Sequence, residues 1–275
     1  MDSTDHLERA AAWLRDADGM LVTAGAGMGV DSGLPDFRGT EGLWHHYPAL
    51  AHARLDFTAI ANPVAFSCDP ELAWGFYGHR LQLYRETIPH AGFAVLARWA
   101  ERMPQGAFVF TSNVDGQFQR AGFADERVAE CHGSIHHMQC TRPCSRDIWP
   151  AAAFEPQVDA KACRLVNALP RCPNCGEIAR PNVLMFGDGE WLPARTDEQE
   201  TRLARWLQGV SRLVVVELGA GRAVPTVRRF SERFGPRVIR INLREPQIPA
   251  SIGIGFAQRA TDVLVQLDEA LGPRA

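Results

Sequence analysis

The chain has 275 residues, of which 46% are hydrophobic and 22% are charged, so its composition is globular and excludes a disordered or collagen-like chain. Its formal charge of −3 at pH 7 argues against sequence-independent binding of nucleic acid. No apolar run approaches the roughly 18 residues of a membrane span, and the acidic first residues do not resemble a signal peptide. We therefore expect a cytoplasmic protein that binds neither nucleic acid nor membranes.

The first predicted element is an amphipathic helix, in which Leu7, Ala10, Leu14 and Ala17 recur at helical spacing until Gly19 ends the pattern. Short apolar runs then predict buried strands, each close to a helical pattern. The strands are residues 20–24, 108–111, 128–131, 213–216 and 238–241, and the helical patterns are residues 93–103, 201–207, 224–234 and 262–271. This alternation predicts an α/β fold with a Rossmann-like parallel sheet, which binds ligands at the carboxyl ends of its strands.

Two stretches do not follow this alternation, and we interpret both as insertions. Residues 42–91 are rich in aromatic residues and Pro, with a helical portion at residues 70–86, whereas residues 139–178 hold most of the cysteines. Residues 1–41, 92–138 and 179–275 then form one discontinuous Rossmann-like domain. The helical insert and the cysteine-rich insert make up a smaller second domain.

Four of the seven cysteines have the spacing of a metal site, because Cys140 and Cys144 form one short pair and Cys172 and Cys175 form another. Four thiolates complete a closed tetrahedral Zn²⁺ site without an open position for a substrate, so we expect one structural ion in a zinc ribbon. The alternative is four unrelated buried cysteines, but such pairs rarely occur twice without a metal. We expect the other three to be buried packing residues: Cys68, Cys131 and Cys163.

The first predicted strand runs into a glycine loop that contains Gly25, Gly27 and Gly29. Glycine lets the backbone turn tightly and bring its N–H groups close to a pyrophosphate. Such a loop is often only a turn, so this feature does not decide for a nucleotide by itself. The rigid segment that follows, residues 33–39, adds an acid, an aromatic ring and a guanidinium: Asp36, Phe37 and Arg38.

His132 is the candidate general base, because it follows a predicted strand and because histidine exchanges protons near neutral pH. The alternative for any single histidine is a hydrogen-bonded structural role, and we interpret His136 and His137 in that way.

The order of these motifs resembles the sirtuin family, the Sir2-like NAD-dependent protein deacylases. The glycine segment at 25–27 and the segment Gly33-Leu34-Pro35-Asp36-Phe37-Arg38 are similar to the family's first hallmark. Three later blocks resemble its Thr-Gln-Asn-Ile-Asp, His-Gly and Arg-Pro-x-Val-Val-x-Phe-Gly-Glu segments. They are residues 111–115, 130–133 and 180–188.

The resemblance implies that NAD lies on the large domain, that the acyl oxygen of a modified lysine attacks a ribose carbon as nicotinamide leaves, and that His132 then deprotonates a ribose hydroxyl. The catalytic residues would be His132, Asn113 and Asp115. The cofactor contacts would be Gly25, Ala26, Gly27, Asp36, Phe37, Arg38, Asn113, Asp115, Gly219, Ala220, Gly221 and Asn242. The products would be free lysine, nicotinamide and O-acyl-ADP-ribose, and Phe186 and Gly187 would pair with the substrate backbone as an added strand.

Several positions depart from the family pattern. Gly29 replaces a Ser, Ser112 replaces a Gln, and the late Gly-Thr-Ser-Leu segment, which surrounds the adenosine half of NAD, reads Gly219-Ala220-Gly221-Arg222. The two absent hydroxyls would each contribute roughly 0.5 to 1.5 kcal/mol, so we expect weaker NAD binding. A contact from Arg222 to a phosphate would offset that loss.

Tyr77 and Arg80 are three residues apart, so both lie on one face of the predicted helix. Sirtuins that prefer malonyl- and succinyl-lysine carry Tyr-x-x-Arg at this place, with a small Ala sixteen residues before the Tyr, as Ala61 stands here. The alternative is that Tyr77 packs and Arg80 is a solvated surface charge. We predict a preference for acidic acyl groups, because a guanidinium pairs with a carboxylate in a bidentate manner.

Two other functions remain open from the sequence. One is an NAD hydrolase or ADP-ribosyltransferase on the same scaffold, and the other is a weakly active NAD-binding module. The sequence leaves the oligomeric state open, with a monomer as the expectation, and it does not name the acylated proteins that would serve as substrates.

Overall fold

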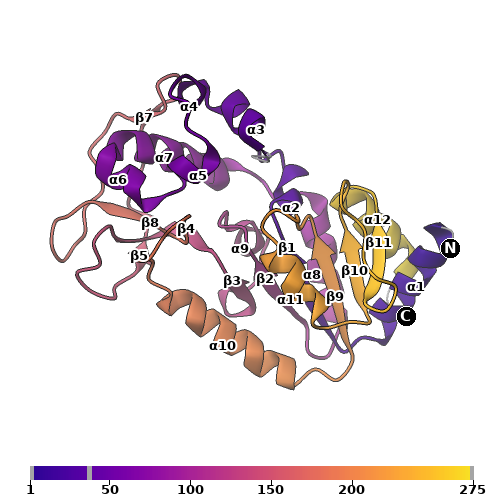
Figure 1. Ribbon diagram of the computed structural model, residues 1–275. Helices are drawn as coiled ribbons and strands as arrows, with labels where there is room; N and C mark the ends of the chain where they lie inside the picture. The colour runs from indigo at the N-terminus through magenta and orange to yellow at the C-terminus, as the bar shows by residue number, and fades with distance from the viewer. Residues whose placement is uncertain (1–2, 36–38, 273–275) are drawn as a thin grey trace.

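The computed structural model describes residues 3–35 and 39–272. A large part with a helix-covered sheet lies beside a smaller part built from short helices and strands (Figure 1). The predicted cofactor residues Asp36, Phe37 and Arg38 lie outside the described residues.

The large part contains one six-stranded sheet, and all of its pairs are parallel. Its strand order is β11-β10-β9-β1-β2-β3, so β1 lies in the middle. The strands are β1 (Gly19–Ala24), β2 (Ala107–Thr111), β3 (Val128–Glu130), β9 (Leu213–Leu218), β10 (Val238–Ile241) and β11 (Gly253–Phe256). The predicted α/β class is confirmed. β11 was not predicted, because two of its four residues are glycine and it has no continuous apolar run.

Helices cover both faces of this sheet, because successive strand residues point to opposite faces. Val22 packs with one group of helices, α1 (Ser3–Asp16), α8 (Ala91–Arg102) and α12 (Ala260–Leu271). Leu21 packs on the other face, with α10 (Ala194–Gln208) and α11 (Thr226–Glu232). Three short helical segments follow strands or loops near the sheet: α2 (Gly27–Val30), α9 (Gln117–Arg120) and the 3₁₀ helix η1 (Asp125–Arg127).

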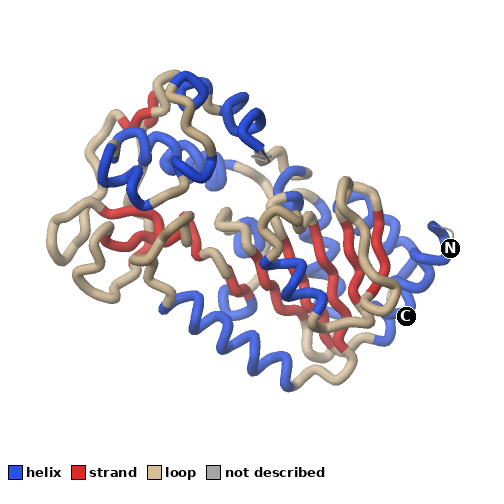
Figure 2. The backbone as a smooth tube through the Cα atoms, in the orientation of Figure 1, coloured by secondary structure: helices blue, strands red, loops and turns tan. Residues whose placement is uncertain are grey.

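The smaller part has its own apolar core. Its helices are α3 (Gly39–His46), α4 (Pro48–His52), α5 (Phe57–Ile60), α6 (Pro63–Cys68) and α7 (Pro70–Glu86). Its strands, which Figure 2 shows apart from the large sheet, are β4 (Gly133–Cys140), β5 (Trp149–Pro150) and β8 (Ala179–Val183) in one antiparallel sheet, and β6 (Val158–Asp159) with β7 (Arg164–Leu165) in another.

The helix α7 is attached to the strand region on which it packs. Trp74 Nε1 donates to Ala179 O at 2.9 Å, and Arg164 forms a 2.9 Å ion pair with Asp69, the N-cap of α7. Asp69 caps this helix and Pro70 begins it, which is a favourable start for a helix.

β4 joins the two parts of the molecule. It pairs with β8, so residues 133–138 and 179–183, which the predicted boundaries assign to the large domain, are hydrogen-bonded to each other in the smaller sheet. The register between β4 and β8 shifts between Ser134 and Met138. Across residues 3–35 and 39–272, no helix is both long and apolar enough to cross a membrane.

Candidate active site and metal centre

Two glycine loops follow β1 and β9 and touch each other backbone to backbone. Gly27 N donates to Gly219 O at 3.1 Å, and Gly25 N donates to Leu218 O at 2.9 Å. A Cβ at Gly25 would lie 2.9 Å from Ala220 Cα, and one at Gly219, whose φ is +60°, would lie 2.4 Å from the carbonyl carbon of Gly27. Only glycine fits at both positions. The order of the strands reverses between β1 and β9, where open parallel sheets bind ligands.

Asn113 follows β2 and reaches back to the first glycine loop. Its Nδ2 donates to Gly25 O at 3.0 Å, and its backbone N donates to Thr111 Oγ1 at 3.0 Å. The described residues predicted to contact the cofactor therefore follow the carboxyl ends of β1, β2, β9 and β10: Gly25, Ala26, Gly27, Asn113, Asp115, Gly219, Ala220, Gly221 and Asn242.

His132 follows β3 at the same edge of the sheet. Its backbone O accepts a 2.9 Å hydrogen bond from Leu184 N, and the preceding Cys131 N donates to Thr111 O at 2.9 Å. Burial lowers the pKa of His132 below its usual 6.5, and a hydrogen bond with the backbone of Ser112 opposes that shift. A lowered pKa keeps the imidazole neutral at physiological pH, which is the form a general base needs.

Asp115 is a buried carboxyl in the loop after β2, near Glu130 of β3. Burial raises its pKa to about 6, and the nearby Glu130 adds to the rise, whereas a hydrogen bond from Gln117 N and the charge of Arg80 lower it. The Gln117 N to Asp115 Oδ1 distance is 2.9 Å. His136 Nε2 lies 2.8 Å from Asp115 O, so the interpretation of His136 as a hydrogen-bonded structural histidine agrees with its position. The same interpretation of His137 does not fit, because its Nδ1 is buried without a hydrogen-bond partner among the described residues.

The segment after β8, which includes Phe186 and Gly187, is held by a buried ion pair. Arg180 donates from Nη1 and Nη2 to both carboxylate oxygens of Asp188 at 2.8 Å, and both side chains are fully buried. Phe186 N donates to Ala61 O at 2.9 Å, while the Phe186 side chain is 40% exposed. The structure thus brings the buried Ala61 next to the exposed residues Phe186 and Gly187.

Tyr77 and Arg80 are both buried in α7, so the alternative of a solvated arginine is wrong. Arg80 donates from Nε and Nη2 to Tyr84 Oη at 2.9 and 2.7 Å. Its Cζ lies 5.2 Å from the ring centroid of Phe76 and 5.7 Å from that of Tyr77. Burial raises the pKa of Tyr77 to about 12, so its phenol stays protonated and can donate.

The loop after β10 faces the second glycine loop. Asn242 Nδ2 donates to Ala220 O at 2.8 Å, and its Oδ1 accepts from Glu245 N at 2.9 Å. Glu245 Oε2 accepts from Arg222 N at 3.0 Å, and Arg222 Nη2 donates to Gln247 Oε1 at 2.9 Å. Arg222 therefore bridges the two loops and is exposed.

The four predicted zinc ligands lie together, with all of their sulfur atoms within 4.8 Å of one another. Cys140 Sγ lies 3.7 Å from Cys175 Sγ, and Cys144 Sγ lies 3.6 Å from Cys172 Sγ. A tetrahedron with Zn–S bonds of about 2.3 Å has sulfur atoms about 3.8 Å apart. The four thiols are therefore positioned to bind one metal ion, and they fit zinc. Of the other cysteines, Cys131 and Cys163 are buried as predicted, but Cys68 is exposed at the end of α6, so that prediction is wrong.

Two residues beside the predicted site were not found from the sequence. Tyr84 lies one helical turn after Arg80, a spacing that would have indicated the contact. Glu245 is brought to the glycine loop by the fold alone, because nothing in the local sequence links it to Arg222.

Residues 25–215 match the model of the Sir2 family. An NAD-dependent protein deacylase of Pyrococcus furiosus is 32% identical over 90% of this chain and 91% of its own length. NAD-dependent protein deacylase 2 of Pyrobaculum aerophilum is 33% identical over 90% and 89%. A crystal structure of a Sir2 homologue in complex with NAD is 26% identical, covers 96% of this chain and 93% of its own, and has a TM-score of 0.72.

The family match covers more than half of the chain, and two relatives that are 32% and 33% identical each align over 90% of it. The chain therefore belongs to the Sir2 family.

Proposed function

We propose that the protein is an NAD-dependent protein-lysine deacylase that prefers acidic acyl groups, succinyl and malonyl, over acetyl. The deacylase activity is supported by the relatives, which carry that name, and by the NAD complex of a Sir2 homologue. The acyl preference is supported by one observation above the others, the buried guanidinium of Arg80 in α7.

A line of aromatic rings connects the exposed substrate segment with Arg80. The Phe186 ring lies 5.9 Å from that of Phe57, which lies 6.3 Å from that of Phe76, and Phe76 contacts Arg80. An acyl chain that follows these rings would be shielded from water and would meet a cation at its far end. An acetyl group is too short to use that charge, whereas a carboxylate at the end of a succinyl group would pair with it.

Arg80 also belongs to the electrostatic surroundings of the predicted ribose site, because its charge lowers the pKa of Asp115. Arg80 and Asp115 therefore lie within electrostatic reach of each other. Ala61, whose carbonyl accepts a hydrogen bond from Phe186 N, has a small side chain that would leave more room for a long acyl chain than a larger residue.

Each residue of the site has its own role in the proposed reaction. When bound, NAD supplies a ribose carbon that accepts the acyl oxygen as nicotinamide departs. Neutral His132 takes a proton from a ribose hydroxyl. Asn113 and Asp115 orient the ribose, and the segment at Phe186 and Gly187 pairs with the substrate backbone, so that main-chain hydrogen bonds give affinity with little sequence preference.

The test is nicotinamide release by the zinc-loaded protein under three conditions: NAD alone, NAD with an acetyl-lysine peptide, and NAD with the same peptide succinylated. We expect release only with peptide and a higher kcat/KM for the succinyl form. Release with NAD alone would instead support an NAD hydrolase, and binding of NAD without release would support a weakly active module. A higher kcat/KM for the acetyl peptide would contradict the acyl preference and leave the deacylase.

A further inference from the structure

Arg228 of α11 is buried under the two loops at the predicted adenosine end. Its side chain is 7% exposed. Its Nε donates to Ala220 O at 3.0 Å, and its Nη2 donates to Glu245 O. One planar guanidinium therefore holds a carbonyl of the glycine loop after β9 and a carbonyl of the loop after β10.

The carbonyl of Ala220 accepts a second bond from Asn242, and the carboxylate of Glu245 accepts from Arg222 N. The same carboxylate lies 3.8 Å from Arg228 Nη2. The two loops are thus linked by the guanidinium of Arg228 and by the carboxylate of Glu245. This is the segment in which Ala220 and Gly221 replace the two hydroxyl residues of the family pattern.

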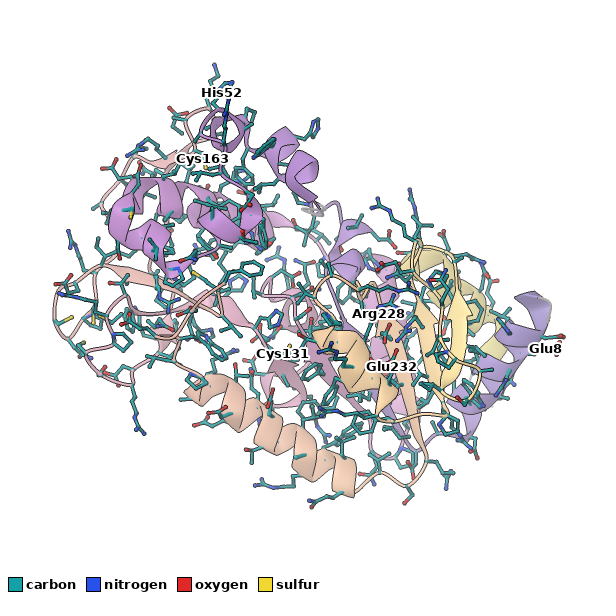
Figure 3. The ribbon with its side chains drawn as sticks, viewed as in Figure 1. Glu8, His52, Cys131, Cys163, Arg228 and Glu232 are labelled. Carbon is teal, nitrogen blue, oxygen red and sulfur yellow. The ribbon has the colours of Figure 1, made fainter. Side chains whose placement is uncertain are left out.

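A buried charge needs compensation, and the neighbouring strands supply it. Arg240 of β10 pairs with Glu217 of β9 and with Glu232 of α11, at 2.5 and 2.8 Å, and its Nη1 donates to Gln247 O at 2.8 Å. Figure 3 labels Arg228 and Glu232, which project from α11 toward the strands beneath it. Arg228 and Arg240 therefore lie together with the carboxylates of Glu217 and Glu232, and each arginine donates to a carbonyl of the loop after β10.

We propose that Arg228 is a positioning residue for NAD, which fixes the two adenosine loops from behind and replaces the ordering that the absent loop hydroxyls would provide. The proposal rests on the proposed function in one respect, that NAD binds at these loops. Arg228 acts through the carbonyls of Ala220 and Glu245 and does not touch the reacting atoms. Its removal should weaken the adenosine half of the cofactor site and leave the acyl half unchanged.

The test uses Arg228→Met, with Arg229→Met as the matched control, because Arg229 is the exposed neighbour on the same helix. The binding of ADP-ribose, which carries the adenosine half, is measured by calorimetry on the zinc-loaded full chain. We expect Arg228→Met to weaken it on the order of tenfold, the scale of one or two charge-assisted bonds, and to raise KM for NAD with kcat and KM for the peptide unchanged. Arg229→Met should behave as wild type.

Arg228→Lys covers the case in which the Met variant does not fold. It keeps the buried charge but loses the fork that reaches two carbonyls, so we expect intermediate ADP-ribose affinity at a wild-type melting temperature. Wild-type ADP-ribose affinity in whichever variant folds would overturn the proposal, as would an equal loss for ADP-ribose and peptide. A wild-type protein that binds ADP-ribose but deacylates no peptide would contradict the proposed function and not this inference.

Discussion

The two ends of the predicted site each contain a buried arginine, but the two arginines have different surroundings. At the adenosine end, Arg228 donates to backbone carbonyls and its neighbour Arg240 is paired with Glu217. At the acyl end, Arg80 donates to the phenol oxygen of Tyr84 and lies 5.2 Å from the ring of Phe76.

These surroundings suit Arg228 to hold the loops of the site in place and suit Arg80 to bind a ligand. A carbonyl of the main chain cannot leave without moving the loop to which it belongs. A phenol is a neutral side-chain acceptor, whereas a carboxylate carries a full opposite charge and can accept two parallel hydrogen bonds from one guanidinium. A ligand carboxylate can therefore take over donors of Arg80 from Tyr84, whereas Arg228 keeps its partners.

Removal of the metal should have the largest effect, and it should affect the acyl end of the site more than the adenosine end. The acyl end depends on the zinc module, since α7 is tied to it by Trp74 and by the ion pair of Asp69 with Arg164. We expect chelation, or Cys144→Ser, to abolish turnover of the acyl peptide and lower the melting temperature, because metal binding is coupled to folding of such modules.

The matched control for the metal experiment is Cys68→Ser, since this exposed cysteine lies outside the cluster. ADP-ribose binding should survive in both variants, because the two adenosine loops are held by strands of the large sheet. A metal-free protein with full activity, or equal loss of both functions in Cys144→Ser, would remove this distinction between the ends.

The second prediction concerns His132, the candidate general base. His132→Ala should lower deacylation by roughly 10²-fold or more, the scale of a positioned acid–base catalyst, with ADP-ribose and peptide binding retained. Because burial lowers the pKa of His132, the neutral base persists below pH 6.5, and wild-type kcat should fall only at lower pH. Turnover in His132→Ala close to that of the wild type would exclude His132 as the general base.

The third prediction acts on the acyl end alone. Arg80→Met should lower kcat/KM for a succinyl peptide by roughly tenfold or more relative to an acetyl peptide, because the ligand carboxylate would be buried without a cation. KM for NAD should change little. Tyr84→Phe is the companion variant, since it removes only the phenol oxygen, and it should keep the succinyl preference. An unchanged ratio of the two peptides in Arg80→Met would end the acidic-acyl proposal.

The smallest effect concerns the stability of the unliganded protein. The folded-state pKa of Asp115 is raised to about 6, so its ionisation costs stability as pH rises from about 4 through 6. Asp115→Asn keeps the acceptor for Gln117 N and removes that cost. Its melting temperature should exceed the wild-type value by roughly 5 °C at pH 8, with a smaller gain at pH 4. The exposed Asp125→Asn should show no such pH-dependent difference.

The fold could be predicted where local sequence carries its own signal. Strands buried on both faces read as continuous apolar runs, and the Asp69-Pro70 start fixed the beginning of α7. β11 was missed because Gly253 and Gly255 break its apolar run. α10 begins at Ala194, well before the predicted residue 201, since its first turns are polar.

The residues of the candidate site also differ in how far the sequence predicts their positions. The glycine loops, His132 and the four cysteines belong to short motifs, so their positions at the sheet edge and in the metal cluster could be anticipated. The contacts of Arg228, Glu245 and Arg180 could not, because each links segments that only the folded chain brings together. Their roles in the reaction stay predictions until the variants are measured.

The central position of β1 has a consequence for the synthesis of the protein. β1 is made early, but one of its two neighbours, β9, belongs to the last quarter of the chain. The contact between their glycine loops therefore cannot form on a nascent chain until β9 has left the ribosome. Strand pairs that are so distant in sequence form slowly and leave strand edges unpaired until they form. A fragment that lacks β9 would therefore keep one edge of β1 unpaired, and it would lack the second glycine loop that a cofactor would need in order to stabilise it.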